Sequence, residues 1–253
     1  MKTNTWFLIR ELAWTDFKLR YNSLALGYFW SLLHPFLIFG VYYLVFSVFA
    51  KIGGVPHYPL YLLLGIILWN YFAESSSNGM QSMQFKASLI SNIYLPKSVI
   101  LIASNFTSLL TLSLNLGVFA LFFALSSKRP AAAVGFFLVF LLELIILSFA
   151  ASLLLSSYFL KFRDLYYLWG VALQIGFWLT PIIYPVELVP ERFRWLILLN
   201  PLARIIQDAR SAVLGLAPPP LRHHLVSLAM VAAALVLGIA VFVRRSSRFA
   251  EEV

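Results

Sequence analysis

Long runs without a charged residue are the feature that most constrains this chain. Residues 28–50 contain no Asp, Glu, Lys or Arg, and as a helix they are long enough to cross a hydrocarbon layer of about 30 Å. Similar apolar runs recur, and the short loops between them hold most of the charges. Only 11% of the residues are charged and the mean hydropathy is +0.86, whereas about a quarter of a soluble domain is charged. The pattern excludes a soluble domain and predicts an all-α polytopic membrane protein.

Six segments are long and apolar enough to be predicted as transmembrane helices. They cover about 28–50, 58–79, 98–125, 133–160, 165–184 and 225–243. Pro35 is expected to kink the first of them without ending it, because neighbouring helices can satisfy the carbonyl that it frees. Residues 28–253 therefore form one six-span transmembrane domain in this prediction.

Residues 1–27 precede the first predicted span, and 5–22 have the periodicity of an amphipathic helix. One side carries Glu11, Thr15, Lys18 and Asn22, and the other carries Trp6, Ile9, Ala13 and Phe17. This pattern predicts a helix that lies in the membrane interface with its apolar face toward the lipid. A frayed terminus is the alternative.

The stretch between the fifth and sixth spans differs from the rest because prolines interrupt it. Pro185, Pro190, Pro201 and Pro218–Pro220 leave two short apolar pieces, about 187–199 and 202–215. Each piece is too short to cross a membrane. We expect a re-entrant helical pair over about 187–215, and the alternative is a small helical cap on the surface.

Six spans place both termini on one side of the membrane. Eleven Lys and Arg residues lie on the side of the termini and eight on the other, which favours cytoplasmic termini by a narrow margin. The net charge of +9 is spread over many loops and suits the headgroups of membrane lipids rather than nucleic acid.

No motif for catalysis or ATP binding is present. The chain lacks the Gly-x-x-x-x-Gly-Lys-Ser/Thr phosphate loop and contains no cysteine, and helix neighbours such as His223 and His224 cannot face one metal. Interfacial anchoring is the preferred role of these histidines. We therefore expect no enzyme activity, no metal and no cofactor in this chain, so the energy for any transport must come from another subunit.

Aromatic residues make up 17% of the chain and gather on the first and fifth spans. Flat aromatic faces suit the apolar C–H faces of sugar rings. The candidates for lining a passage are Phe36, Phe39, Tyr42, Tyr43, Phe46, Trp178 and Tyr184. Packing and contact with lipid are the alternatives. Glu143 lies inside the fourth span, where an acid is costly, and either a structural hydrogen bond or a transport role explains it.

Four motifs, in order along the chain, resemble those of ABC-type polysaccharide-export permeases. The first is Arg20-Tyr21-Asn22-Ser23 with Leu26–Trp30 and Pro35. The second is the segment Lys86–Pro96, which ends in Ile93-Tyr94-Leu95-Pro96, and the third is Phe162-Arg163-Asp164-Leu165. The fourth is the run Phe177–Pro185 followed by Leu199-Asn200-Pro201-Leu202.

The resemblance implies a homodimer that binds two copies of a separate ATP-binding cassette subunit, which would hold ATP and Mg. It implies that the re-entrant pair closes the outer side, that both termini are cytoplasmic in the inner membrane, and that the aromatic side chains line the passage. The implied substrate is a lipid-linked polysaccharide of the O-antigen or teichoic-acid type. The residues implied to couple to the ATPase are Arg20, Lys86, Tyr94, Pro96, Arg163 and Asp164.

Two alternatives stay open. A permease of the same kind could export a drug, an antibiotic or haem. A membrane-embedded enzyme acting on polyprenyl lipids is the second alternative, but it requires clustered carboxylates or basic residues at the loop mouths. Here the acids Glu74, Glu143, Asp164 and Asp208 lie on different segments. Neighbouring genes for an ATPase and for glycosyltransferases would favour polysaccharide export.

Overall fold

The computed structural model describes residues 5–22, 29–49, 51, 56–86, 96–126, 135–216 and 220–246, which form helices and turns without a β-strand. In chain order the elements are α1 (Thr5–Asn22), α2 (Phe29–Tyr42), the π-helix η1 (Tyr43–Phe49), α3 (Tyr58–Phe85), α5 (Lys97–Leu125), α6 (Phe137–Phe159), α7 (Leu165–Leu179), the 3-10 turn η3 (Val186–Leu188), α8 (Glu191–Leu198), α9 (Pro201–Leu214) and α10 (Leu221–Ser246).

Three of these helices are long and apolar enough to cross a membrane: α5, α6 and residues Leu221–Arg245 of α10. Pro35–Phe49 and α7 are equally apolar but shorter. α3, with 28 residues, is also long, but its second half is rich in serine and therefore more polar than its first half. The all-helical class and the several apolar helices agree with a polytopic membrane protein.

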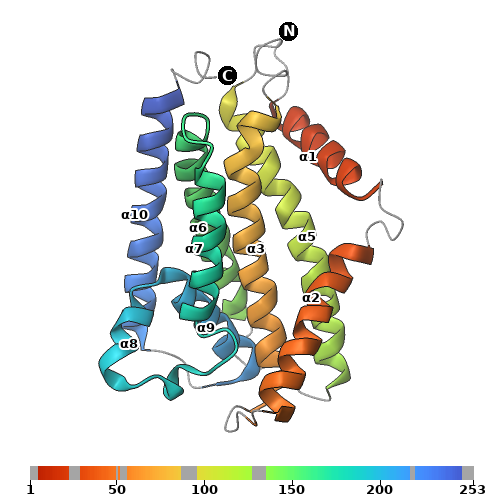
Figure 1. Ribbon diagram of the computed structural model, residues 1–253, viewed down its shortest axis with the longest axis vertical. Helices are drawn as coiled ribbons and strands as arrows, with labels where there is room; N and C mark the ends of the chain where they lie inside the picture. Colours follow the sequence, from red (N-terminus) through yellow and green to blue (C-terminus); the bar gives the residue numbers. More distant parts are fainter. Residues whose placement is uncertain are drawn as a thin grey trace.

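The long helices run between the two ends of a bundle (Figure 1). α3 stands near the middle and packs on α5 and α6, and α6 packs in turn on α10. α1 and the last turn of α10 lie at one end, whereas α8 and α9 lie at the other (Figure 1). We call these the α1 end and the α9 end.

The core is built around the first half of α3. Leu62, Leu63 and Leu64 are consecutive and fully buried, which requires protein on every side of the helix. A helix that is apolar all round is typical of such a position. α3 is therefore the central element against which the other helices pack.

A polar seam joins the second half of α3 to α5 and α6. Asn105 accepts hydrogen bonds from Ser75 at 2.7 Å and from Ser152 at 3.1 Å, and Asn78 donates to Ser108 at 3.1 Å. At Gly79 a Cβ atom would lie 2.4 Å from that of Ser152. Small residues and shared hydrogen bonds of this kind hold helices together where water is absent.

Several helix ends differ from the predicted span boundaries. α3 continues beyond 79 to Phe85, because Met80 and Met83 are buried. α7 ends at Leu179 rather than near 184 because Thr180, which precedes Pro181, is extended, as residues before proline prefer.

Candidate functional site

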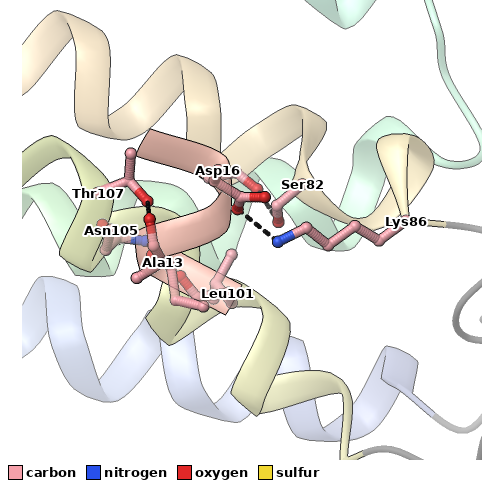
Figure 2. A network of polar contacts seen from close by, with 9 residues as sticks. Ala13, Asp16, Ser82, Lys86, Leu101, Asn105 and Thr107 are labelled. Atoms are coloured by element: carbon pink, nitrogen blue, oxygen red, sulfur yellow. Dashed lines mark hydrogen bonds and ion pairs between the residues drawn. The ribbon is translucent and has the colours of Figure 1, made fainter. Parts of the chain in front are cut away.

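At the α1 end, α1 packs on α5 rather than turning its apolar face to lipid. Ile9 and Ala13 form a buried cluster with Val99 and Ala103, and Thr107 donates a hydrogen bond to the carbonyl of Ala13 at 3.2 Å (Figure 2). The predicted orientation of this face is therefore wrong. Trp6, at the start of the same face, remains 60% exposed.

An ion pair fixes α1 to the end of α3. Lys86 Nζ lies 2.5 Å from Asp16 Oδ2 (Figure 2), and the two side chains are only 15% and 29% exposed. Lys86, which the sequence singles out for coupling to an ATPase, thus has a partner within its own chain. The sequence does not indicate a role for Asp16, because its partner lies 70 residues away.

The turn between α6 and α7 presents Arg163 and Asp164, and both are exposed. The turn lies at the α1 end (Figure 1), and its backbone is fixed because Asp164 O accepts from the amide of Tyr167 at 3.0 Å. Pro96 directly precedes α5. Tyr94 and the side chain of Arg20 lie outside the described residues.

The aromatic stripe of α2 and η1 packs against other helices of the same chain. Phe36 meets Phe122 of α5, with ring centroids 5.5 Å apart, and Tyr42 stacks on Phe177 of α7 at 5.6 Å. The rings that sequence analysis assigned to a passage here, Phe36, Phe39, Tyr42, Tyr43 and Phe46, are all partly buried against the core.

The aromatic residues near the end of α7 are placed differently. Trp178 is 52% exposed, and its carbonyl accepts a hydrogen bond from the Tyr184 hydroxyl at 2.8 Å. No residue of α7 is buried. The structure therefore joins the α2 stripe to α7 through Tyr42 and Phe177, while Trp178 points away from the core.

Acids that are far apart in the sequence converge where α6, α9 and α10 meet. Glu143 is 6% exposed and accepts a hydrogen bond from Ser227 at 3.1 Å. Asp208 Oδ2 lies 2.8 Å from Nδ1 of His224, whose ring stacks on Phe140. His224 is thus held by Asp208, a contact that its predicted role as an interfacial anchor did not include. The described residues contain no group of three or more His, Asp and Glu residues that could hold a metal.

At the α9 end, a non-helical segment of five residues, Thr180–Tyr184, connects α7 to the elements that follow. We call it the strap. The side-chain amide of Asn200 donates to the Thr180 hydroxyl at 3.0 Å, and its oxygen accepts from the Leu202 amide at the start of α9. This double role explains why a Thr-Pro and an Asn-Pro pair occur together in one motif.

The chain is similar to known proteins over most of its length. The family described as "ABC-2 type transporter" matches residues 8–214. Two proteins of Klebsiella pneumoniae named "O-antigen export system permease protein RfbA" are each 29% identical over 239 residues, covering 93% of this chain and 91% of the relative. A protein of Myxococcus xanthus with the same name is 26% identical over 249 residues, covering 97% of this chain and 95% of its own. Because the family match spans most of the chain, from within α1 to the end of α9, the chain belongs to the ABC-2 type transporters.

Proposed function

We propose that the chain is the permease subunit of an ABC transporter that exports a lipid-linked polysaccharide, of the O-antigen or teichoic-acid type, across the inner membrane. The observation that carries this proposal is the similarity to O-antigen export permeases along 93% or more of the chain. The family match over residues 8–214 includes most of α1 and all of α8 and α9.

In the proposed topology the chain crosses the membrane six times, through α2 with η1, α3, α5, α6, α7 and α10. The alternation of these elements between the two ends of the bundle supports it (Figure 1). The α1 end is the cytoplasmic end, because it holds Lys161, Arg163 and the last turn of α10 with Arg244 and Arg245, as the positive-inside rule expects. α8 and α9 form the re-entrant pair on the outer side.

ATP and Mg are bound by a separate cassette subunit, two copies of which dock at the α1 end. The exposed turn with Arg163 and Asp164 is the proposed contact, and the Asp16–Lys86 ion pair holds α1 beside it. Reversing both charges, Arg163→Glu with Asp164→Lys, should reduce co-purification of the cassette subunit or separate ATP hydrolysis from export. Unchanged export would remove this turn from the interface.

Two copies of the chain form the passage in this proposal. α2, η1 and α7 carry apolar side chains such as Leu37, Val41, Leu44 and Val171 that are largely exposed in a single chain. A second copy against these helices would cover part of this surface and would bring two aromatic stripes together. Trp178 and Tyr184 would then face the passage near its outer end.

The decisive experiment deletes the gene and restores it on a plasmid. We expect polysaccharide to disappear from the cell surface and its lipid-linked form to build up inside, and complementation should reverse both. The purified chain should not hydrolyse ATP without the cassette subunit. Normal surface polysaccharide combined with altered sensitivity to a drug would favour the drug-exporter alternative, and conversion of a polyprenyl lipid by the isolated chain would favour the enzyme.

A further inference from the structure

Arg210 of α9 is the largest side chain in the described residues that is fully buried. Removing a guanidinium group from water is unfavourable unless its donors find acceptors. The ion pairs found among the described residues do not include Arg210. Its acceptors are instead backbone carbonyls.

Both terminal nitrogens of Arg210 donate to the strap. Nη1 lies 2.7 Å from the carbonyl oxygen of Pro181, and Nη2 lies 2.7 Å from that of Ile182. The Cζ atom stands 3.6 Å from the centre of the Tyr61 ring, a distance at which a cation interacts favourably with the ring face. Arg210 therefore joins α9, the strap and α3.

Two tyrosines of α3 continue the same pattern along the strap. The Tyr58 hydroxyl donates to the carbonyl of Ile183 at 2.8 Å, and that of Tyr61 donates to the carbonyl of Tyr184 at 3.4 Å. Four successive carbonyls, from Pro181 to Tyr184, thus each accept a hydrogen bond from a side chain. Backbone that is not helical and is shielded from water needs such partners.

α3 is shaped to receive the guanidinium. Gly65 follows Tyr61 by one helical turn, and a Cβ atom at this position would lie 1.7 Å from Nη2 of Arg210. Tyr58, Tyr61 and Gly65 are spaced three and four residues apart and so lie on one face of the helix. We call Tyr58, Tyr61, Arg210 and the strap the carbonyl clamp.

α8 has no comparable attachment. Only Ile197 of its eight residues is buried, whereas ten of the fourteen residues of α9 are buried. Its polar contacts are with neighbouring segments: Arg194 donates to the carbonyl of Val189, and Arg204 of α9 donates to the carbonyl of Leu198. The two short helices that sequence analysis treated as a pair are therefore held very differently.

We propose that Arg210 is a positioning residue that fixes α9 and the strap to α3 as one unit, and that the outer end opens by movement of α8 relative to this unit. The proposal rests on the proposed function as an exporter. Separating α9 from the strap would leave a buried cation and two carbonyls without partners. Displacing α8 exposes far less buried surface.

A disulfide between the strap and the residue that precedes α9 tests whether the strap and α9 separate. The chain has no cysteine of its own, so Thr180→Cys with Asn200→Cys can form only the intended bond within a chain, between side chains that are hydrogen-bonded at 3.0 Å. In the complex with the cassette subunit in nanodiscs, we expect oxidised and reduced samples to hydrolyse ATP and transport at rates within twofold. A tenfold loss on oxidation that a reductant reverses would overturn the proposal.

Hydrogen exchange in the unmodified complex gives an independent measurement. During ATP turnover, amides of 191–198 should exchange at least tenfold faster than at rest, while those of 180–184 and 203–214 keep their resting rates. Faster exchange in the strap, or unchanged exchange in α8, contradicts the proposal. Hydrogen exchange can be measured without knowing the cargo. It can therefore contradict the proposal about Arg210 and α8 even if the gene-deletion experiment supports the proposed function.

A pair of substitutions tests the role of Arg210 itself. Gly65→Ala should displace the guanidinium and raise exchange in the strap, and Arg210→Met should do the same. In the double variant the shorter methionine side chain no longer reaches the position of Nη2, so the alanine displaces nothing there and we expect no further increase over Arg210→Met. Additive effects, or normal exchange in Arg210→Met, would show that Arg210 does not hold the strap.

Discussion

The ion pair between Asp16 and Lys86 offers the clearest test of how α1 is held against the bundle. Both side chains are less than a third exposed, so water screens them less than a surface pair. Removing one partner leaves the other charge partly buried, which costs about 1–3 kcal/mol. At about 1.4 kcal/mol per factor of ten, the docking equilibrium of α1 should weaken by roughly 5-fold to 150-fold.

Exchanging the two charges shows whether the ion pair is required or whether the individual residues are. Asp16→Lys or Lys86→Asp alone should reduce export and make α1 more accessible to trypsin, whereas Asp16→Lys with Lys86→Asp should recover much of both. The measurements are surface polysaccharide, ATP hydrolysis of the complex and the rate of cleavage within α1, each corrected for expression.

Glu11→Lys is the matched control, because the Arg10–Glu11 pair on the same helix is 60% and 47% exposed. A surface pair of this kind contributes about 0–1 kcal/mol, so this variant should behave almost like the unmodified chain. The reasoning is refuted if the exchanged pair is as impaired as either single variant, or if Glu11→Lys is equally harmful.

Three further outcomes are expected. Gly79→Ala should destabilise the bundle by about 1–3 kcal/mol through overpacking against Ser152, and thermal unfolding in detergent should show it, while Gly117→Ala, where a Cβ atom meets nothing within 4 Å, should not. Tyr43→Ala should reduce export at normal expression if the stripe lines the passage, and lost expression would instead indicate packing. Glu143→Gln can still accept a hydrogen bond, so near-normal export and stability would assign the acid a structural role, whereas lost export at normal expression would support transport.

Local sequence patterns predict the helices well because their causes are local. The uncharged runs predict the apolar helices, and the periodicity from Trp6 to Phe17 predicts α1, which covers the expected residues Thr5–Asn22. Prolines mark the breaks around α8 and α9. What α1 packs against is not a local property. The periodicity therefore predicts an apolar face without showing that this face contacts α5.

The clamp could not be predicted because its partners are distant in the sequence. Tyr58 and Ile183 are 125 residues apart, and Arg210 lies 28 residues beyond Ile182. One signal was available: Arg204, Asp208 and Arg210 interrupt the apolar piece 202–215, which sequence analysis predicts as one half of the re-entrant pair. Composition also failed to separate α8 from α9, since both are short and rich in apolar residues but differ greatly in burial.

Asp208 and Arg210 have opposite charges, yet each contacts a different part of the bundle. Residues two apart on a helix point in nearly opposite directions, so Asp208 reaches His224 of α10 while Arg210 reaches the strap and α3. α9 is thereby fixed on two sides. Asp208 connects it to α10, and Arg210 connects it to the strap and α3.

α3 links this arrangement to the opposite end of the molecule. Its first turns carry Tyr58, Tyr61 and Gly65 of the clamp, and Lys86, directly after its last turn, holds α1 through Asp16. A helix of this length spans about 40 Å and connects the clamp to the α1 end. In the proposed function, a displacement that ATP hydrolysis produces at the α1 end and that α3 transmits as a rigid helix would carry the strap and α9 with it. α8, which lies outside the clamp and has only one buried residue, would then change its position relative to them.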